Sequence, residues 1–247
     1  MTKTRKALAL ALLLTVGGMA QAQTCQDTSF EGVGYTVCDV PAGADLRLWL
    51  TAPDGRPVGS FERLRELAAA EGREVVFAMN AGMYHADRSA VGLHIENGET
   101  QSGAVTGGGG GNFGLLPNGI FCIQPGSFAV LETKAFLANP PACTHATQSG
   151  PMLVIGGELH PRFLVDSDST YIRNGVGVSA DGQTARFALS QGAVNFHSFG
   201  RFFRDVLDTP EALYLDGSIS RIYAPELGRD QGGRPMGPIV GLLAPTD

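Results

Sequence analysis

The sequence predicts an α+β fold, with largely antiparallel β-sheets and two or three flanking helices in a single compact domain. Most of the chain consists of short apolar runs, and around Leu46, Leu48 and Leu50 the residues alternate as in a half-buried strand. Gly-containing pairs typical of tight hairpin turns separate such runs at 97–98, 156–157 and 181–182. Strands and helices do not alternate regularly, so neither a doubly wound sheet nor a barrel of βα units is expected.

The expected strands are apolar runs rich in strand-forming residues. In chain order they span 45–51, 75–79, 91–95, 119–123, 128–131, 152–155, 176–179, 185–190, 212–215 and 238–243. Two segments have helical spacing instead: Ser60 is placed to cap a helix over 61–72 that Gly72 terminates, and 195–209 carries phenylalanines at helical intervals. The low-complexity segment 106–114 is expected to be a mobile loop.

The first 22 residues have the pattern of a secretory signal peptide. Basic residues precede the apolar run 7–16, and Ala20-Gln21-Ala22 forms a small-residue cleavage site. We expect cleavage after Ala22, which leaves residues 23–247 as one domain in the periplasm or outside the cell. No later segment approaches the roughly 20 apolar residues that a membrane-spanning helix needs, so the chain is not expected to be transmembrane.

The charge distribution argues against nucleic acid or an anionic membrane as the main partner. The formal net charge is −6, and the predicted signal peptide holds three of the 18 basic residues and no acidic one. The mature domain is therefore more acidic still, and it has no basic run.

The four cysteines predict disulfide bonds. They show no C-x-x-C pair and no zinc-finger spacing, and an even count in an exported protein points to oxidised pairs. Of the three possible pairings we favour the two local ones, Cys25–Cys38 and Cys122–Cys143.

Several common catalytic motifs are missing. The five glycines at 107–111 lack the Gly-Lys-Ser/Thr ending of a phosphate-binding loop, and there is no G-x-S-x-G or H-E-x-x-H motif. Asp166 and Asp168 follow an apolar run in the manner of an aspartate-nucleophile phosphatase, but no lysine follows them. We interpret this pair as a solvated loop and keep a metal-dependent phosphatase as an alternative.

Polar residues gather instead at four strand ends, each beside a glycine. The four junctions are Asn80 with Gly82, Gln148-Ser149-Gly150, Arg173-Asn174-Gly175 and Asp216-Gly217. Glycine allows close backbone approach or a positive φ, which suits loops that close around a ligand. Each junction alone is typical of a turn, but four in one domain indicate a binding or catalytic site.

The order and spacing of these motifs resemble the phosphodiester glycosidase family, from about Leu46 to Leu243. The family's motifs fall on 80–82, 148–151, 173–177 and 215–220. Three departures are visible: Asn174 replaces a threonine, Ser218-Ile219 replace two glycines, and His197 stands where many relatives have a small hydroxyl residue.

The resemblance implies cleavage of a sugar-1-phosphodiester. Asp216 would act at the anomeric carbon and Arg173 at the phosphate, while His85 and His197 are candidates for proton transfer because histidine changes charge near neutral pH. No cofactor is expected to be required, although a divalent metal stays open. The expected partner is a carbohydrate phosphodiester or an envelope glycan, and a non-catalytic glycan-binding module is a further alternative. Substrate contacts are expected from Asn80, Gly82, Gln148, Ser149, Gly150, Asn174, Gly217, Ser218 and Ser220.

Overall fold

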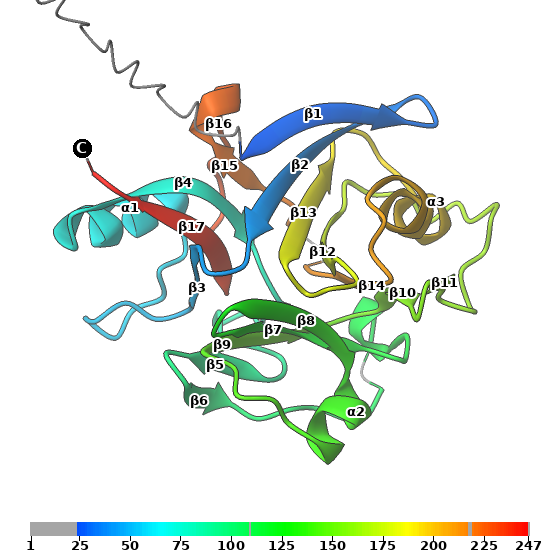
Figure 1. The fold of residues 1–247 in the computed structure, drawn as a ribbon, viewed down its shortest axis with the longest axis horizontal. Helices are drawn as coiled ribbons and strands as arrows, with labels where there is room; N and C mark the ends of the chain where they lie inside the picture. The colour runs from blue at the N-terminus through cyan, green and yellow to red at the C-terminus, as the bar shows by residue number, and fades with distance from the viewer. Residues whose placement is uncertain (1–23, 109, 217–218, 247) are drawn as a thin grey trace, which may run out of the picture.

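The computed structural model describes residues 24–108, 110–216 and 219–246, and in these residues the chain forms three antiparallel sheets with short helices on their outer sides (Figure 1). This confirms the predicted α+β class. The predicted signal peptide lies outside the described residues. None of the helices formed by the described residues is long and apolar enough to cross a membrane.

The largest sheet has seven strands, which all pair antiparallel. Its order is β1 (Cys25–Phe30), β2 (Val33–Pro41), β13 (Thr184–Ser190), β12 (Asn174–Val178), β14 (Glu211–Tyr214), β10 (Met152–Ile155) and β11 (Glu158–Leu159).

Two five-stranded sheets complete the β-structure. The order of one is β16 (Arg229–Asp230), β15 (Ile222–Ala224), β4 (Arg73–Asn80), β17 (Ile239–Pro245) and β3 (Asp45–Trp49). The order of the other is β6 (Glu99–Ser102), β5 (His94–Glu96), β9 (His145–Ser149), β7 (Gly119–Gln124) and β8 (Ser127–Glu132).

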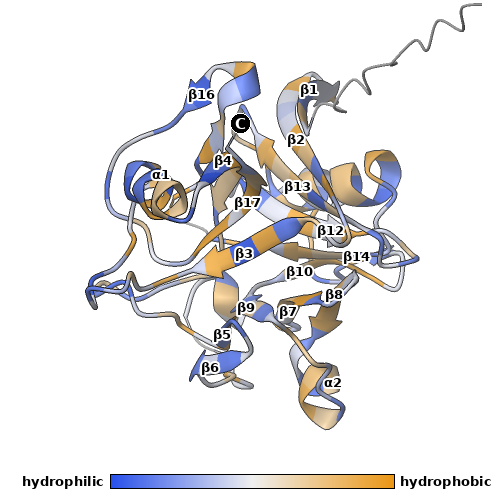
Figure 2. Ribbon diagram, turned by 60° about the vertical axis from the view of Figure 1, so that its left-hand side comes forward, coloured by the Kyte–Doolittle hydropathy of each residue, from blue (hydrophilic) through white to orange (hydrophobic). Residues whose placement is uncertain are grey.

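The three sheets meet at one apolar core. Each contributes an aromatic ring: Phe187 of β13 lies 5.2 Å from Phe77 of β4 and 5.6 Å from Phe121 of β7, measured between ring centroids. All three rings are buried in one cluster. Figure 2 shows the same distribution, with apolar residues on the central strands and polar residues on peripheral β16 and β6.

The two expected helices are present. α1 (Phe61–Ala70) is capped by the Ser60 hydroxyl, which accepts from the backbone N–H of Arg63 at 3.2 Å. Gly72 takes a positive φ of 68° where the chain leaves the helix. α3 (Phe196–Arg201) is capped by the Asn195 side chain and continues as a π-helical turn (Phe202–Val206).

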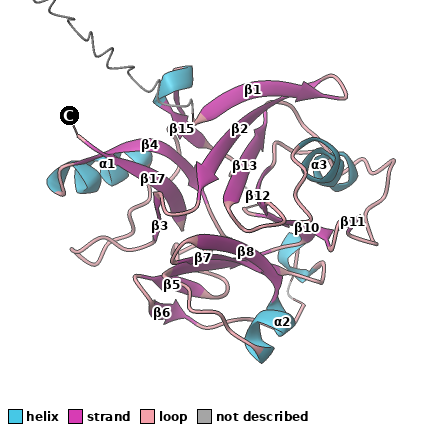
Figure 3. Cartoon of the chain, in the orientation of Figure 1, coloured by secondary structure: helices cyan, strands magenta, loops and turns pink. Residues whose placement is uncertain are grey.

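The third helix, α2 (Thr133–Ala138), lies on a segment that no sequence pattern indicated, and Figure 3 shows it beside β7 and β8. Short 3-10 turns occur at Asn112–Gly114 and Pro225–Leu227. Both favoured disulfides, Cys25–Cys38 and Cys122–Cys143, are confirmed. The hairpin turns at Asn97-Gly98, Gly156-Gly157 and Asp181-Gly182 are confirmed as well.

Candidate active site

A cavity of about 640 Å³ brings four distant parts of the chain together. Its walls come from the segment after β4, the glycine-rich loop, the β11–β12 connection and the end of β14. The lining residues are Met83, Tyr84, His85, Val91, Gly110, Gly111, Asn112, Phe113, Ser169, Tyr171 and Asp216.

Asp216 is the carboxylate of this pocket. It lies two residues after the end of β14 and is only 6 % exposed. Tyr84 is its neighbour: burial raises the pKa of Tyr84 to about 12, and the charge of Asp216 and a hydrogen bond to it act in the same direction. The Tyr84 hydroxyl therefore stays protonated at neutral pH and can donate a hydrogen bond to a carboxylate or a substrate oxygen.

Gly237 packs closely against the ring of Tyr84. A Cβ at position 237 would lie 2.5 Å from both Cβ and Cδ1 of Tyr84. Only glycine leaves room for the ring there, so this residue determines where the Tyr84 hydroxyl meets Asp216.

Asn80 fastens the segment that follows Asp216. It is fully buried, and its side-chain amide donates to the carbonyl oxygen of Ile219 at 2.5 Å and accepts from the backbone N–H of Arg221 at 2.8 Å. Its own carbonyl oxygen accepts from Asn174 at 2.8 Å. The polar groups of Asn80 thus bind protein backbone and neighbouring side chains in this structure.

Ser220 and Ser149 extend the same framework. Ser220 donates to the carbonyl oxygen of Ile172 at 3.1 Å and lies 3.4 Å from the Asn174 side chain. Ser149 donates to the carbonyl oxygen of Leu215 at 2.6 Å. Both hydroxyls therefore hold the chain on either side of the pocket carboxylate. Gly217 and Ser218, also predicted to contact substrate, lie outside the described residues.

Gln148 fastens the opposite wall. Its amide oxygen accepts from the backbone N–H groups of Leu93 and Val105, and its amide nitrogen donates to the Val105 carbonyl at 2.7 Å and to Thr133 at 3.0 Å. Val91, two residues before Leu93, lines the pocket. Gln148 therefore positions two loops of the wall through their backbones.

The predicted glycines 82 and 150 allow close packing behind this wall. A Cβ at Gly82 would lie 2.5 Å from the carbonyl oxygen of Gln148, and one at Gly150 would lie 2.6 Å from Cβ of Asn118. Their contribution in this structure is to permit the contact between strands and loops.

Arg173 lies behind the pocket wall rather than on it. Its guanidinium is fully buried, donates to the carbonyl oxygens of Val194 and Ser169, and packs 3.7 Å from the ring centroid of Phe196. Burial lowers its pKa, but a guanidinium keeps its charge at neutral pH. The buried Tyr214 is a further neighbour, with its ring centroid 5.3 Å from the guanidinium carbon. A buried positive charge thus adjoins a wall that contains Ser169 and Tyr171.

The two predicted histidines have different positions. His85 is exposed and lines the pocket two residues before Asp87. His197 is half-buried on α3 and is not among the lining residues. The geometry brings His85 and Asp216 together and leaves His197 apart from them.

The Asp166–Asp168 pair lies on the connection between β11 and β12, with both side chains exposed. Within the residues that the structure describes, no group of three His, Cys, Asp or Glu side chains is placed to hold a metal ion.

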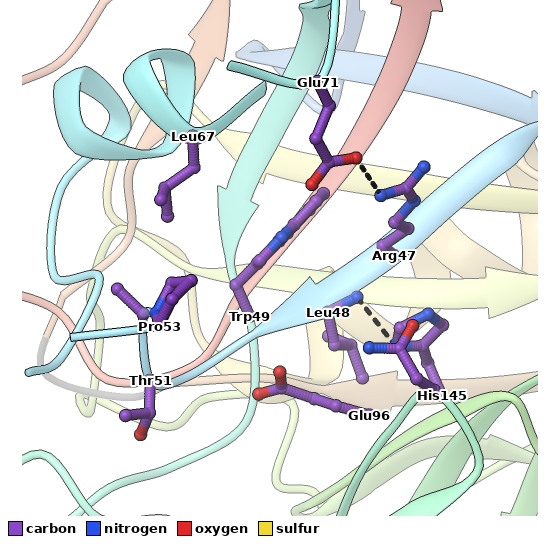
Figure 4. A pocket seen from close by; sticks show the side chains of 11 residues that line it. Arg47, Leu48, Trp49, Thr51, Pro53, Leu67, Glu71, Glu96 and His145 are labelled. Carbon is purple, nitrogen blue, oxygen red and sulfur yellow. Dashed lines mark hydrogen bonds and ion pairs between the residues drawn. The ribbon is translucent and has the colours of Figure 1, made fainter. Parts of the chain in front are cut away.

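A smaller pocket of about 270 Å³ lies between β3, α1 and β9, and its polar groups are already engaged (Figure 4). Arg47 pairs with Glu71 at 2.8 Å. Glu96 accepts from the backbone N–H of Leu50 at 2.7 Å, and His145 Nδ1 accepts from that of Leu48 at 3.4 Å. These contacts connect β3 and the residue after it to β5 and β9, so these polar groups stabilise the fold.

Sequence reasoning missed part of the pocket wall. The low-complexity pattern of segment 106–114 predicts only a mobile loop, yet Asn112 and Phe113 line the cavity. Tyr171 and Ser169 also line it, although no motif marked them. Arg173, only two residues beyond Tyr171, was the available signal for this part of the wall.

Comparisons with known proteins indicate a family and a fold. A family model described as phosphodiester glycosidase matches residues 73–240. The Escherichia coli (strain K12) protein YigE, described as uncharacterized, is 33% identical over 216 residues, which is 87% of this chain and 83% of YigE. The zebrafish N-acetylglucosamine-1-phosphodiester alpha-N-acetylglucosaminidase catalytic domain, auto-inhibited by its pro-peptide, superposes with a TM-score of 0.58. That match covers 88% of this chain and 81% of the zebrafish chain at 16% identity, so it is a likeness of fold.

Proposed function

The chain belongs to the phosphodiester glycosidase family and is accordingly a glycosidase that acts on phosphodiesters; we propose that it is exported and that its substrate is a sugar-1-phosphodiester, which it hydrolyses to free sugar and a phosphomonoester. The observation that carries the proposal is Asp216, a nearly buried carboxylate in a 640 Å³ pocket beside Tyr84 and His85.

In this reaction the bond between the anomeric carbon and the phosphate oxygen breaks. The oxygen keeps the electron pair and leaves as a phosphomonoester, and the oxygen of a water molecule bonds to the anomeric carbon and loses a proton. A phosphomonoester is a weak base, so a strong general acid matters less than in ordinary glycoside hydrolysis. The main requirement is stabilisation of positive charge at the anomeric carbon.

Asp216 meets that requirement as an anion held in a partly water-excluded pocket, where a charge acts more strongly than in water. Tyr84 orients the carboxylate through its retained proton. His85, on the exposed side of the same pocket, is placed to take the proton of the attacking water.

The phosphate would lie toward the Ser169 and Tyr171 wall. Arg173 behind this wall supplies a positive charge and is bonded to the carbonyl oxygen of Ser169, a residue of the wall. Arg88 adds a second cation, 5.4 Å from the centroid of the Tyr84 ring. Because Arg173 is fully buried behind the wall, it acts on the phosphate through its charge and not through direct hydrogen bonds.

The test is hydrolysis of a panel of sugar-1-phosphodiesters by the purified mature protein, with and without a chelator. We expect free sugar and phosphomonoester in equal amounts, lost in Asp216→Asn and kept in Asp166→Asn and Asp168→Asn. Inorganic phosphate released from monoesters, abolished by chelator and by Asp166→Asn, would support the phosphatase instead. Saturable glycan binding without turnover would support a binding module.

A further inference from the structure

The large exposed apolar side chains of the described residues are concentrated beside the candidate active site. Leu164 is 70% exposed, Val165 63%, Tyr171 56% and Ile172 48%. All four lie within the nine residues 164–172, on the connection between β11 and β12, and the same connection lines the pocket through Tyr171. Water-exposed apolar side chains gathered at one place indicate a surface that binds something.

This connection is fixed by its backbone. Asn195 donates to the carbonyl oxygens of Val165 and Ser167 at 2.9 and 3.3 Å. Val194, the residue before it, exchanges both backbone hydrogen bonds with Tyr171, at 3.1 and 2.9 Å.

Since Val194 and Asn195 are consecutive, with Cα atoms about 3.8 Å apart, the backbones of Val165 and Tyr171 are held close to each other. The buried Arg173 adds a further bond, to the Ser169 carbonyl at 2.9 Å. The apolar side chains are therefore presented on a pinned segment, so binding an apolar group there requires little ordering of the protein.

The chemistry of the substrate indicates which of its groups would contact this apolar surface. A phosphodiester has two ester substituents, and if the sugar occupies the pocket by Asp216, the second substituent leaves the phosphate and extends past the Ser169–Tyr171 wall. Resting on the proposed function, we propose that the connection 164–172 forms a subsite for an apolar leaving-group chain, so that the substrate class is a sugar phosphate esterified to an alkyl or isoprenoid-like lipid.

The test compares matched substrates that share one sugar and differ only in the phosphate ester, methyl against octyl, at concentrations where both are monomeric. Burial of one methylene is worth roughly a four-fold gain in affinity, so two buried methylenes give more than about ten-fold. We expect KM for the octyl ester to be about ten-fold lower than for the methyl ester, with kcat nearly equal.

The variant that tests the subsite is Leu164→Ser/Val165→Ser. It should raise KM for the octyl ester about ten-fold and leave the kinetics with the methyl ester unchanged. The matched control, Leu137→Ser/Val206→Ser, removes two other exposed apolar side chains, which are 46% and 43% exposed and lie on α2 and on the π-helical turn. It should retain the preference for octyl.

A second measurement separates this inference from the proposed function. Calorimetric titration with octyl phosphate and methyl phosphate needs no turnover, and octyl phosphate should bind about ten-fold more tightly to the wild type but not to the double variant. If no phosphodiester is cleaved but this difference is found, the subsite stands and the proposed function fails. Cleavage without any chain-length preference overturns the subsite. So does a wild-type dimer in sedimentation velocity that the double variant abolishes, since the surface would then bind a second copy.

Discussion

Asn80→Asp distinguishes a residue that holds the active-site loop from one that binds substrate. The substitution keeps the size of the side chain and the oxygen that accepts from the Arg221 N–H. It replaces the amide group that donates to the Ile219 carbonyl at 2.5 Å with a second oxygen. Two acceptors then face each other at a fully buried position.

The expected cost follows from these contacts. Leaving a buried acceptor unsatisfied costs about 1–3 kcal/mol, and more when the new group carries a charge. We therefore expect the free energy of unfolding to fall by about 3 kcal/mol. For a domain of this size one kcal/mol corresponds to roughly 2–4 °C, so the melting temperature should fall by about 6–12 °C.

Thermal unfolding and kcat/KM should be measured together for Asn80→Asp and for the control Asn139→Asp, whose side chain is exposed at the end of α2. The control should unfold within about 1–2 °C of the wild type, because exposed substitutions rarely change stability by more than 0.5 kcal/mol. An Asn80→Asp protein of wild-type stability with greatly reduced kcat/KM would refute the reasoning, because it would mean that Asn80 acts on substrate.

The remaining predictions concern the packing of Gly237 against Tyr84, the Cys122–Cys143 disulfide and the buried His145. Gly237→Ala should displace the Tyr84 ring, which a new Cβ would approach to 2.5 Å; kcat/KM should fall at least about ten-fold, and wild-type activity would contradict this. Cys122→Ser/Cys143→Ser opens a loop with a sequence separation of 21 and should lower the free energy of unfolding in urea by about 3 kcal/mol; a loss below about 1 kcal/mol would contradict it. Burial lowers the pKa of His145 from 6.5 to about 4. Between these pH values the unfolded chain binds one more proton than the folded protein. The free energy of unfolding therefore falls as the pH is lowered, by up to about 3 kcal/mol. Urea unfolding at pH 7 and pH 4.5 should show a smaller loss in His145→Gln than in the wild type, and an equal loss would exclude this histidine as the cause.

The apolar pattern predicted strands that have one buried face, and it failed for a strand whose buried side chains are mostly polar. β3 alternates and was expected, and α1 was expected from its cap at Ser60 and its apolar face. β9 is buried at every residue from His145 to Ser149, although most of these side chains are polar. It is stable inside because Gln148 and Ser149 find hydrogen-bond partners, and such pairing cannot be read from a hydrophobic pattern.

The sequence marked two residues that line the pocket, His85 and Asp216, but it did not show which groups the other polar residues would bind. Asn80 and Gln148 do adjoin the pocket, as the strand-end glycines indicated. However, the Asn80 amide meets Ile219, 139 residues away in the sequence, and only the tertiary fold decides whether an amide faces a ligand or a backbone. Asp216 differs because its carboxylate lies on the pocket itself.

The central claim, that this pocket cleaves the bond at the anomeric carbon, is tested most directly by hydrolysis in ¹⁸O-labelled water followed by mass spectrometry of both products. Attack at the anomeric carbon places the label in the free sugar and leaves the phosphomonoester unlabelled, and this is the predicted result. Label in the phosphomonoester with an unlabelled sugar product would mean attack at phosphorus, which contradicts a glycosidase mechanism centred on Asp216.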